Sequence, residues 1–219
     1  MERLNKDYGV LKRREQPTRS FTKGFLQLLY VAHAQIPLAS PYTMTDIDGT
    51  ARSIQGESGT GGAVRRSHAG LRIGSAAGSS SVLCYFGSGT IADFSALGQT
   101  IPGEKVGIQV GTGVAAVTPT DTALATRILH GRATGRLEYG GCELVGIAFV
   151  NPNGEFVIRR YFTNLSGGSI TVNEVGIYSV GGQDNYAWAF LIARDIVSPG
   201  LAVANNELLR VTYVPQITV

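Results

Sequence analysis

Residues 155–214 read EFVIRRYFTNLSGGSITVNEVGIYSVGGQDNYAWAFLIARDIVSPGLAVANNELLRVTYV, and the fold class follows from their pattern. Four segments rich in Val, Ile, Tyr, Phe and Thr are separated by clusters of Gly, Asn, Ser and Pro at 164–168, 181–185 and 198–206. Such segments indicate strands joined by tight loops. Their spacing favours an antiparallel β-sandwich of the jelly-roll or immunoglobulin-like kind over alternating strands and helices.

The strand pattern extends upstream, so we predict one all-β domain of roughly seven to nine strands over residues 68–219. Further strands are expected at 81–89, 105–113 and 136–150. In residues 155–163, Phe156, Ile158 and Phe162 fall on one face of the strand, whereas Arg159 falls on the other. Between the strands, residues 118–129 are expected to contain one short helical turn.

Residues 1–67 are predicted to form an extended N-terminal arm and linker. Residues 1–30 hold seven Lys/Arg and three Asp/Glu, a net charge of +4, whereas the whole chain carries +3. The basic character therefore belongs to the N-terminus. Because Tyr8 and Phe21 are the only aromatic residues that lie between these basic residues, nucleic acid is not the expected partner.

One segment of the arm, residues 20–36, has apolar residues at helical spacing, with Ser20 as the expected N-cap and Pro37 as the stop. A strand is the alternative for LQLLYVAHA at residues 26–34. The helix is apolar on several faces, so it is expected to dock on its own β-domain or on a neighbouring subunit. The candidate assembly residues are Phe21, Phe25, Leu28 and Leu29. Residues 38–68 are rich in Gly, Ser and Thr without periodicity and are predicted to be a loop or linker.

The composition points to a protein that buries surface between subunits. Only 16% of the residues are charged and 29 are glycine, which leaves little charge to cover a monomer. Cys84 and Cys142 are expected to be free, buried thiols. The basic start shows no secretory signal, and no apolar run reaches the ~20 residues that a membrane span needs.

Several matches to catalytic motifs lack the context that their chemistry requires. Asp46-Ile-Asp48-Gly49-Thr50 matches the DxDGT string of haloacid-dehalogenase-type phosphatases, but no apolar strand precedes it. As a calcium loop the same stretch lacks glycine at its sixth position. The histidines and acidic residues show no spacing typical of a metal site or of an acid–base pair. We therefore predict a non-enzymatic protein without metal or cofactor.

Two stretches together resemble a known family. Residues 106–128 (VGIQVGTGVAAVTPTDTALATRI) resemble the V-G-T-G-x-x-A-x-T-P-x-D block of tailed-bacteriophage virion proteins. The C-terminal stretch, with NLSG, EVGIY and ARD, resembles the partner block of the same proteins. The resemblance implies a structural β-sandwich of the neck, tail or capsid surface, located in the virion and made in the cytoplasm of the host bacterium. Its expected partners are copies of itself and other virion proteins, namely portal or adaptor, tail and capsid proteins.

Turn residues within these blocks are candidates for specifying the fold. Gly111 and Gly113 match the GxGxxA pattern of dinucleotide-binding proteins. We interpret them as turn glycines of a β-protein, so no bound dinucleotide is expected. Asn164, Gly167 and Gly168 are expected to supply the positive φ angles of a tight hairpin.

Charged residues in the same blocks are expected to have packing roles. Glu174 lies on an otherwise apolar strand and is expected to accept backbone N–H groups from a neighbouring loop. Asp121 is expected to cap the turn that follows it. Asp195 is expected to pair with Arg194 and to fix the last crossover.

An alternative function is a carbohydrate-binding receptor module that recognises a host-surface glycan. Exposed aromatic residues near turns would carry it, and the candidates are Tyr139, Tyr178, Tyr186 and Trp188. Trp188 is better explained by core packing.

Overall fold

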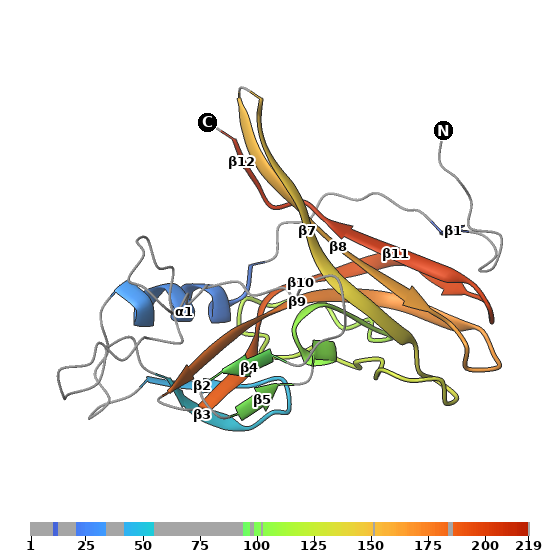
Figure 1. Ribbon diagram of the computed structural model, residues 1–219, viewed down its shortest axis with the longest axis horizontal. Helices are drawn as coiled ribbons and strands as arrows, with labels where there is room; N and C mark the ends of the chain where they lie inside the picture. Colours follow the sequence, from blue (N-terminus) through green and yellow to red (C-terminus); the bar gives the residue numbers. More distant parts are fainter. Residues whose placement is uncertain are drawn as a thin grey trace.

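The computed structural model of the protein describes residues 11–12, 21–33, 42–54, 94–96, 99–101, 103–150, 152–183 and 186–218. It confirms the predicted all-β antiparallel sandwich with one short helix (Figure 1). The predicted strand 81–89, Cys84 and the basic residues preceding Leu11 lie outside the described residues.

Two sheets form the body. The first sheet has the order β1 (Leu11–Lys12), β11 (Leu208–Tyr213), β8 (Asn153–Thr163) and β12 (Gln216–Thr218), with β7 (Glu138–Val150) also paired to β8. The second sheet has the order β10 (Tyr186–Val203), β9 (Ile170–Gln183) and β6 (Gly107–Gly111). Smaller elements are α1 (Lys23–His33), the hairpins β2 (Tyr42–Thr45)–β3 (Ala51–Ile54) and β4 (Phe94–Ala96)–β5 (Gln99–Ile101), and the 3₁₀ turn η1 (Gly103–Lys105).

The core lies between the two sheets. Ile158 and Phe162 of β8 belong to the same buried cluster as Ile108 of β6, Ile177 of β9 and Phe190 of β10. This is the inner face that alternation predicts for 155–163, and burial of these side chains is the main force that holds the sheets together.

The loop after β8 is a crossover, so the prediction of a hairpin there is wrong. β8 pairs with strands of the first sheet, whereas β9, which follows, pairs with β10 and β6 of the second. Residues 164–169 therefore carry the chain from one layer to the other. The positive φ angle is found at Gly167 (84°), whereas Asn164 and Gly168 do not have one.

The turn predicted at 198–206 is shorter than expected. β10 continues to Val203 and pairs with β9 as far as Ile170, with an irregularity between Ile196 and Leu201. Apolar residues on both sides of this irregularity still lie in the core, namely Ile192 before it and Val203 after it.

The helix α1 is part of the body rather than an extended arm. Leu28 and Val31 lie in the main core cluster, and Thr22, just before the helix, donates from its N–H to the carbonyl of Ile192 in β10 (2.9 Å). The helix begins at Lys23, three residues after the predicted N-cap. Gly24 is needed because a Cβ there would overlap the carbonyl of Leu191.

The prediction of a loop over 38–68 is wrong for residues 42–54, which form the β2–β3 hairpin. Met44 and Ile54 lie in the main core cluster, so the proposed division between residues 67 and 68 does not separate two units there. The turn of this hairpin is the DxDGT string. The Asp46 carboxylate accepts the N–H groups of Asp48 (3.0 Å) and Thr50 (2.9 Å), which closes the turn.

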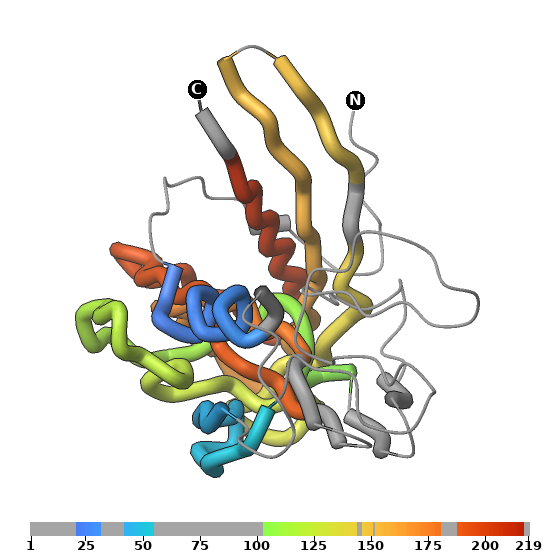
Figure 2. The backbone as a smooth tube through the Cα atoms, turned by 90° about the vertical axis from the view of Figure 1, so that its left-hand side faces the viewer, coloured from blue at the N-terminus to red at the C-terminus, as the bar shows by residue number. Residues whose placement is uncertain are grey.

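The hairpin β7–β8 projects beyond the body of the molecule. In two perpendicular views its tip stands apart from the second sheet and from α1 (Figures 1 and 2). β12 pairs with β8 between Asn153 and Glu155, so the C-terminal strand lies along one side of the projection.

Candidate functional site

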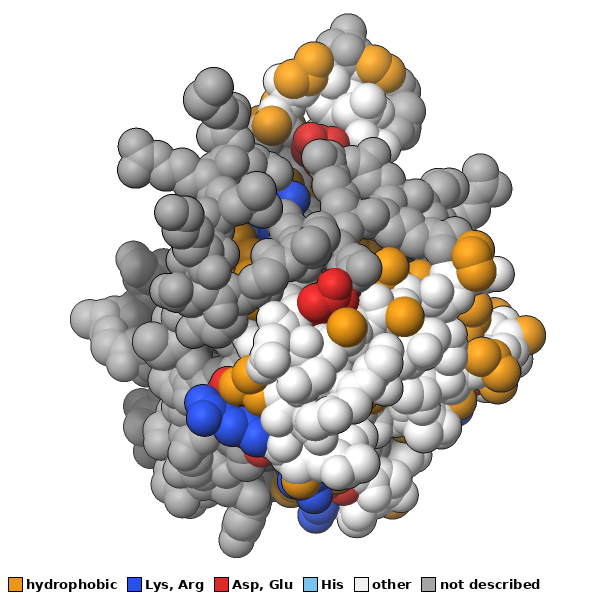
Figure 3. Space-filling model, turned by 90° about the vertical axis from the view of Figure 1, so that its right-hand side faces the viewer, with side chains coloured by type: hydrophobic (Ala, Val, Ile, Leu, Met, Phe, Trp, Pro, Cys, Tyr) orange, Lys and Arg blue, Asp and Glu red, His pale blue; other side chains and the backbone are white. Residues whose placement is uncertain are grey.

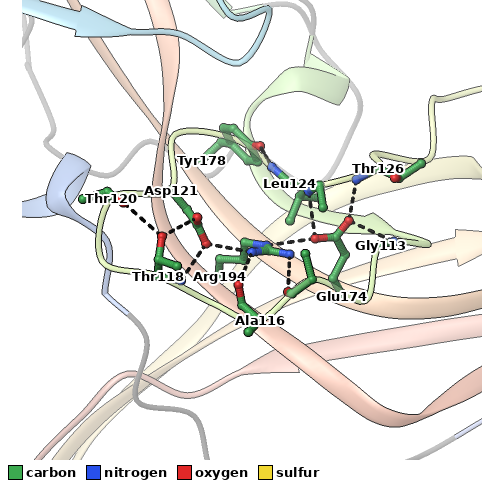
Figure 4. A network of polar contacts seen from close by, with 12 residues as sticks. Gly113, Ala116, Thr118, Thr120, Asp121, Leu124, Thr126, Glu174, Tyr178 and Arg194 are labelled. Atoms are coloured by element: carbon green, nitrogen blue, oxygen red, sulfur yellow. Dashed lines mark hydrogen bonds and ion pairs between the residues drawn. The ribbon is translucent and has the colours of Figure 1, made fainter.

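A buried polar network joins residues 113–126 to the strands β9 and β10 (Figure 4). Glu174 of β9 is fully buried. One of its oxygens, Oε1, accepts the N–H groups of Gly113 (3.1 Å) and Thr126 (2.8 Å), and Oε2 accepts that of Ala125 (3.0 Å). The predicted contact of Glu174 with loop backbone is therefore present, and it fastens residues 113–126 to the second sheet.

Arg194 of β10 completes the network. Its Nε donates to Glu174 Oε2 (2.9 Å) and its Nη1 to Asp121 Oδ2 (2.7 Å). Nη2 donates to the carbonyl of Ala115 (2.9 Å). The guanidinium is almost fully buried, but the hydrogen bonds from Arg194 to Asp121 and Glu174 outweigh this burial and raise the pKa of Arg194. One cation therefore binds two carboxylates and the loop backbone at Ala115.

Asp121 holds the turn that precedes it, so the predicted cap of a following turn is wrong. Its carboxylate accepts the N–H (3.0 Å) and the hydroxyl (2.7 Å) of Thr118. Burial alone would raise the pKa of Asp121, but the hydrogen bonds from Thr118 and Arg194 lower it below its ordinary value. No helical turn forms in residues 118–129.

Gly111 and Gly113 are required by space rather than by turn geometry. A Cβ at either position would overlap the Glu174 carboxylate, and neither glycine has a positive φ angle. The two glycines of the VGTG block thus leave room for the carboxylate of the EVGIY block.

Asn164 forms a second buried junction. Its amide Nδ2 donates to the carbonyls of Gly168 (2.8 Å) and Val203 (2.7 Å), while Oδ1 accepts the N–H of Ser166 (3.0 Å). The backbone of Asn164 also pairs with Asn206 and Glu207. Asn164 therefore joins the crossover 164–169 to the loop before β11.

Asp195 does not pair with Arg194, contrary to the prediction. Neighbouring residues of a strand point to opposite faces. Arg194 faces the network, whereas Asp195 accepts a hydrogen bond from the hydroxyl of Tyr213 in β11. Asp195 thus links the second sheet to the first.

Arg160 is a buried cation that our sequence reasoning missed. It donates to the carbonyls of Gly140 (2.8 Å), Val106 (2.8 Å) and Ile108 (2.9 Å), and its guanidinium lies 4.9 Å from the ring centre of Tyr139. Burial lowers its pKa. Its burial could have been predicted from its position in the strand, because residue 160 shares the inward face of Ile158 and Phe162.

The candidate assembly residues divide between core and surface. Leu28 is 1% exposed, and Phe25 and Leu29 are partly buried against the same core cluster. Phe21 is exposed and stacks on Phe25 at 4.5 Å between ring centres. The outward face of α1 instead presents residues outside the predicted set, Leu26 and Tyr30.

A second apolar surface lies at the tip of the β7–β8 hairpin. Ile147, Phe149 and Val150 are exposed. Figure 3 shows hydrophobic side chains gathered on the projection at the top of that view. The uncharged stretch LVGIAFVNPNG at residues 144–154 could have indicated this surface, but we interpreted it only as part of a strand and its turn.

The aromatic residues of the glycan-binding alternative are mostly internal. Tyr139 and Tyr178 are buried, and Trp188 packs against the core beneath the guanidinium of Arg52 (5.2 Å). The side chain of Tyr186 lies outside the described residues. The described aromatic candidates therefore offer no exposed platform for a sugar ring.

The catalytic and metal motifs gain no support from the geometry. Asp46 is buried, and besides the turn N–H groups its carboxylate binds Arg52 Nε (2.6 Å), so no oxygen is left free to attack a substrate. Within the described ranges, no three His, Cys, Asp or Glu side chains are grouped as metal ligands.

Comparisons with protein-family models, with curated proteins and with solved structures found no match to this chain. In the part of the chain that the structure describes, no helix has the length and hydropathy to cross a membrane.

The two buried tyrosines make the fold sensitive to alkaline pH. Burial raises the pKa of Tyr139 from 10.0 to about 12 and also raises the pKa of Tyr178. In the unfolded chain both phenols ionise near pH 10, so the stability that they contribute is fully present below that pH and is lost as the pH rises. We expect a loss of about 1.4 kcal/mol per tyrosine for each pH unit above 10, up to the folded pKa.

Urea unfolding at about pH 9 and about pH 11, followed by circular dichroism, measures this effect. Tyr139→Phe is expected to reduce the difference between the two pH values. An equal free energy of unfolding at both would contradict the prediction.

Proposed function

We propose that this chain is a non-enzymatic structural protein of a tailed-phage virion that assembles into a homo-oligomer. The observation that carries the assembly role is the projecting β7–β8 tip. Ile147, Phe149 and Val150 stand in solvent on a projection with no charged side chain between residues 144 and 154. Exposed apolar surface of this kind is typical of surfaces that bind another protein.

The virion assignment rests on the resemblance of the two blocks, and the polar network supports it. Four residues of these blocks form one continuous series of contacts: Gly113 of VGTG bonds to Glu174 of EVGIY, Glu174 to Arg194 of ARD, and Arg194 to Asp121 of TPTD. Residues far apart in sequence thus form a single structural unit, which explains why these blocks would recur together. Its carboxylates bind loop backbone and a buried arginine, as expected of a structural element.

The glycan-binding alternative has weaker support, because the structure buries two of its four aromatic candidates. Binding of host-surface glycans lost on Tyr186→Ala, with the fold intact, would favour it over the assembly role.

The assembly role is tested by the solution mass of the purified full-length protein. Light scattering at several concentrations is expected to show one discrete oligomer. A monomer at every concentration would contradict the proposal. The virion role is tested separately, by searching for peptides of this chain in particles produced from the genome that encodes it. Their absence from purified particles would remove the virion assignment without affecting the oligomer.

A further inference from the structure

One segment of the chain, residues 126–137, is attached to both layers of the sandwich, and we call it the linking segment. At its start, Ile128 donates its N–H to the carbonyl of Val110 in β6 of the second sheet (2.9 Å). At its end, Leu137 leads directly into β7 of the first sheet. Leu137 donates its N–H to the carbonyl of Leu129 (3.2 Å) and accepts the N–H of Gly131 (3.0 Å).

Tyr139 of β7 holds the linking segment at two points. Its hydroxyl donates to the carbonyl of Ile128, and its backbone N–H donates to Nδ1 of His130 (3.0 Å). The ring of His130 also packs edge-on against that of Tyr139, with 5.9 Å between ring centres. Tyr139 belongs to the main core cluster, and the guanidinium of Arg160 lies 4.9 Å from the centre of its ring. The side chain of His130 thus takes the place of a backbone acceptor and fastens the segment to the core.

The bond to Tyr139 requires a neutral imidazole at His130. Only an unprotonated ring nitrogen accepts a hydrogen bond, so the ring proton is on Nε2 when Nδ1 accepts. If the imidazole takes up a second proton, both nitrogens become donors. Nδ1–H would then face the N–H of Tyr139, which would lose its acceptor. His130 is partly exposed, so protons from the solvent reach it.

The charged side chains near this bond disfavour a protonated imidazole. Arg136 donates from Nη1 to the carbonyl of His130 itself (3.4 Å), and a second guanidinium lies on the Tyr139 ring. Glu138 precedes Tyr139 in β7, but neighbouring residues of a strand point to opposite faces, and its carboxylate is bound by Arg132 (2.8 Å). A proton on His130 is therefore better tolerated once the segment has left β7.

We infer that His130 is an acid-sensitive switch, and that its protonation detaches the linking segment from β7 while the paired strands of both sheets remain in place. The detached segment binds the proton and the attached segment does not, so acid favours the detached form. The contact is therefore intact above the pH range in which histidine titrates and is lost as the pH falls through that range, from about 7 to about 5. The switch concerns contacts within one chain, so it does not depend on the proposed assembly role.

Hydrogen exchange of the full-length protein at about pH 7.5 and about pH 5, corrected for the intrinsic pH dependence of exchange, tests the switch. We expect peptides that cover residues 127–139 to lose protection about 10-fold or more at the lower pH, because a proton-linked equilibrium changes tenfold for each pH unit. Peptides of β9 are expected to keep their protection. Equal protection of residues 127–139 at both pH values would overturn the inference, and so would an equal loss in β9, which would indicate global unfolding.

Two substitutions separate the switch from a purely structural role of the side chain. Asn places an oxygen as many bonds from Cα as Nδ1 of His, and this oxygen takes up no proton near pH 5. His130→Asn is therefore expected to keep the segment protected at both pH values, whereas His130→Leu, which offers no acceptor, is expected to expose it at both. Acid-dependent loss in His130→Asn would assign the effect to another group and overturn the inference.

His33→Asn is the matched control, because it removes a histidine from the last position of α1 and leaves His130 in place. This variant is expected to show the pH dependence of the wild type. Nitrogen NMR of histidine-labelled protein reads the protonation state of the ring directly. At about pH 7.5 we expect His130 to carry its proton on Nε2, and a proton on Nδ1 at that pH would overturn the inference.

Discussion

Replacing Glu174 by Gln is expected to lower the free energy of unfolding by about 3–5 kcal/mol. The substitution keeps the shape of the side chain but removes the charge that Arg194 binds in a fully buried site. The amide Nε2 that it introduces is a donor and would face the backbone N–H groups of Gly113, Ala125 or Thr126, which are donors themselves. Urea unfolding followed by circular dichroism measures the change.

Glu143→Gln is the matched control for this experiment. Glu143 pairs with Arg159 at 2.7 Å, but both side chains are about one-third exposed, so the pair is screened by water. Its loss is expected to cost less than about 1 kcal/mol. Equal effects of the two substitutions would show that burial does not determine the importance of the Glu174 pair.

The network also fastens the loop 113–126 to the second sheet. The loop contacts the second sheet through Glu174, Arg194 and the hydroxyl of Tyr178, which accepts the N–H of Leu124 (2.9 Å). In Glu174→Gln the loop is therefore expected to lose protection from hydrogen exchange before the strands do.

The strands were predictable because their signal is local. Alternation in 155–163 reports directly which side chains point inward, and Ile158 and Phe162 are indeed in the core. The contact of Glu174 with backbone was predictable for a related reason, since a carboxylate on an apolar strand requires buried donors.

The partners of the other charged residues were not predictable, because they depend on which strands lie side by side. Arg194 was assigned to its sequence neighbour Asp195, although it binds Glu174 on the adjacent strand and Asp121 on a loop. The crossover after β8 was taken for a hairpin, because Gly and Asn indicate a turn without indicating the sheet that the next strand enters. The inward position of Arg160 indicated burial, but the sequence does not show which carbonyls bind it, because those of Val106 and Ile108 come from distant parts of the chain.

The role of α1 was left open by the sequence, because apolar residues on several faces suit either a core or an interface. The structure places Leu28 and Val31 inside and Leu26 and Tyr30 outside. We therefore expect deletion of residues 1–36 to unfold the protein, because it removes Leu28 and Val31 from the core.

Leu28→Ala is the sharper test of this point and is expected to lower the free energy of unfolding by about 2–5 kcal/mol. Leu28 is 1% exposed and packs in the main core cluster, so its truncation leaves a cavity that the surrounding strands fill only in part. Leu26→Ala makes the same chemical change two residues away at a side chain that is 66% exposed. Its effect on unfolding is expected to stay within about 0.5 kcal/mol.

The pair of variants separates two roles of one helix. If α1 were an arm that orders only on a neighbour, both substitutions would leave monomer stability unchanged and both would weaken assembly. If α1 is part of the core, as its burial indicates, Leu28→Ala destabilises the fold, whereas Leu26→Ala leaves it unchanged. Urea unfolding of both proteins at a concentration below that of assembly distinguishes the two, because subunit contacts then contribute nothing to the measured stability.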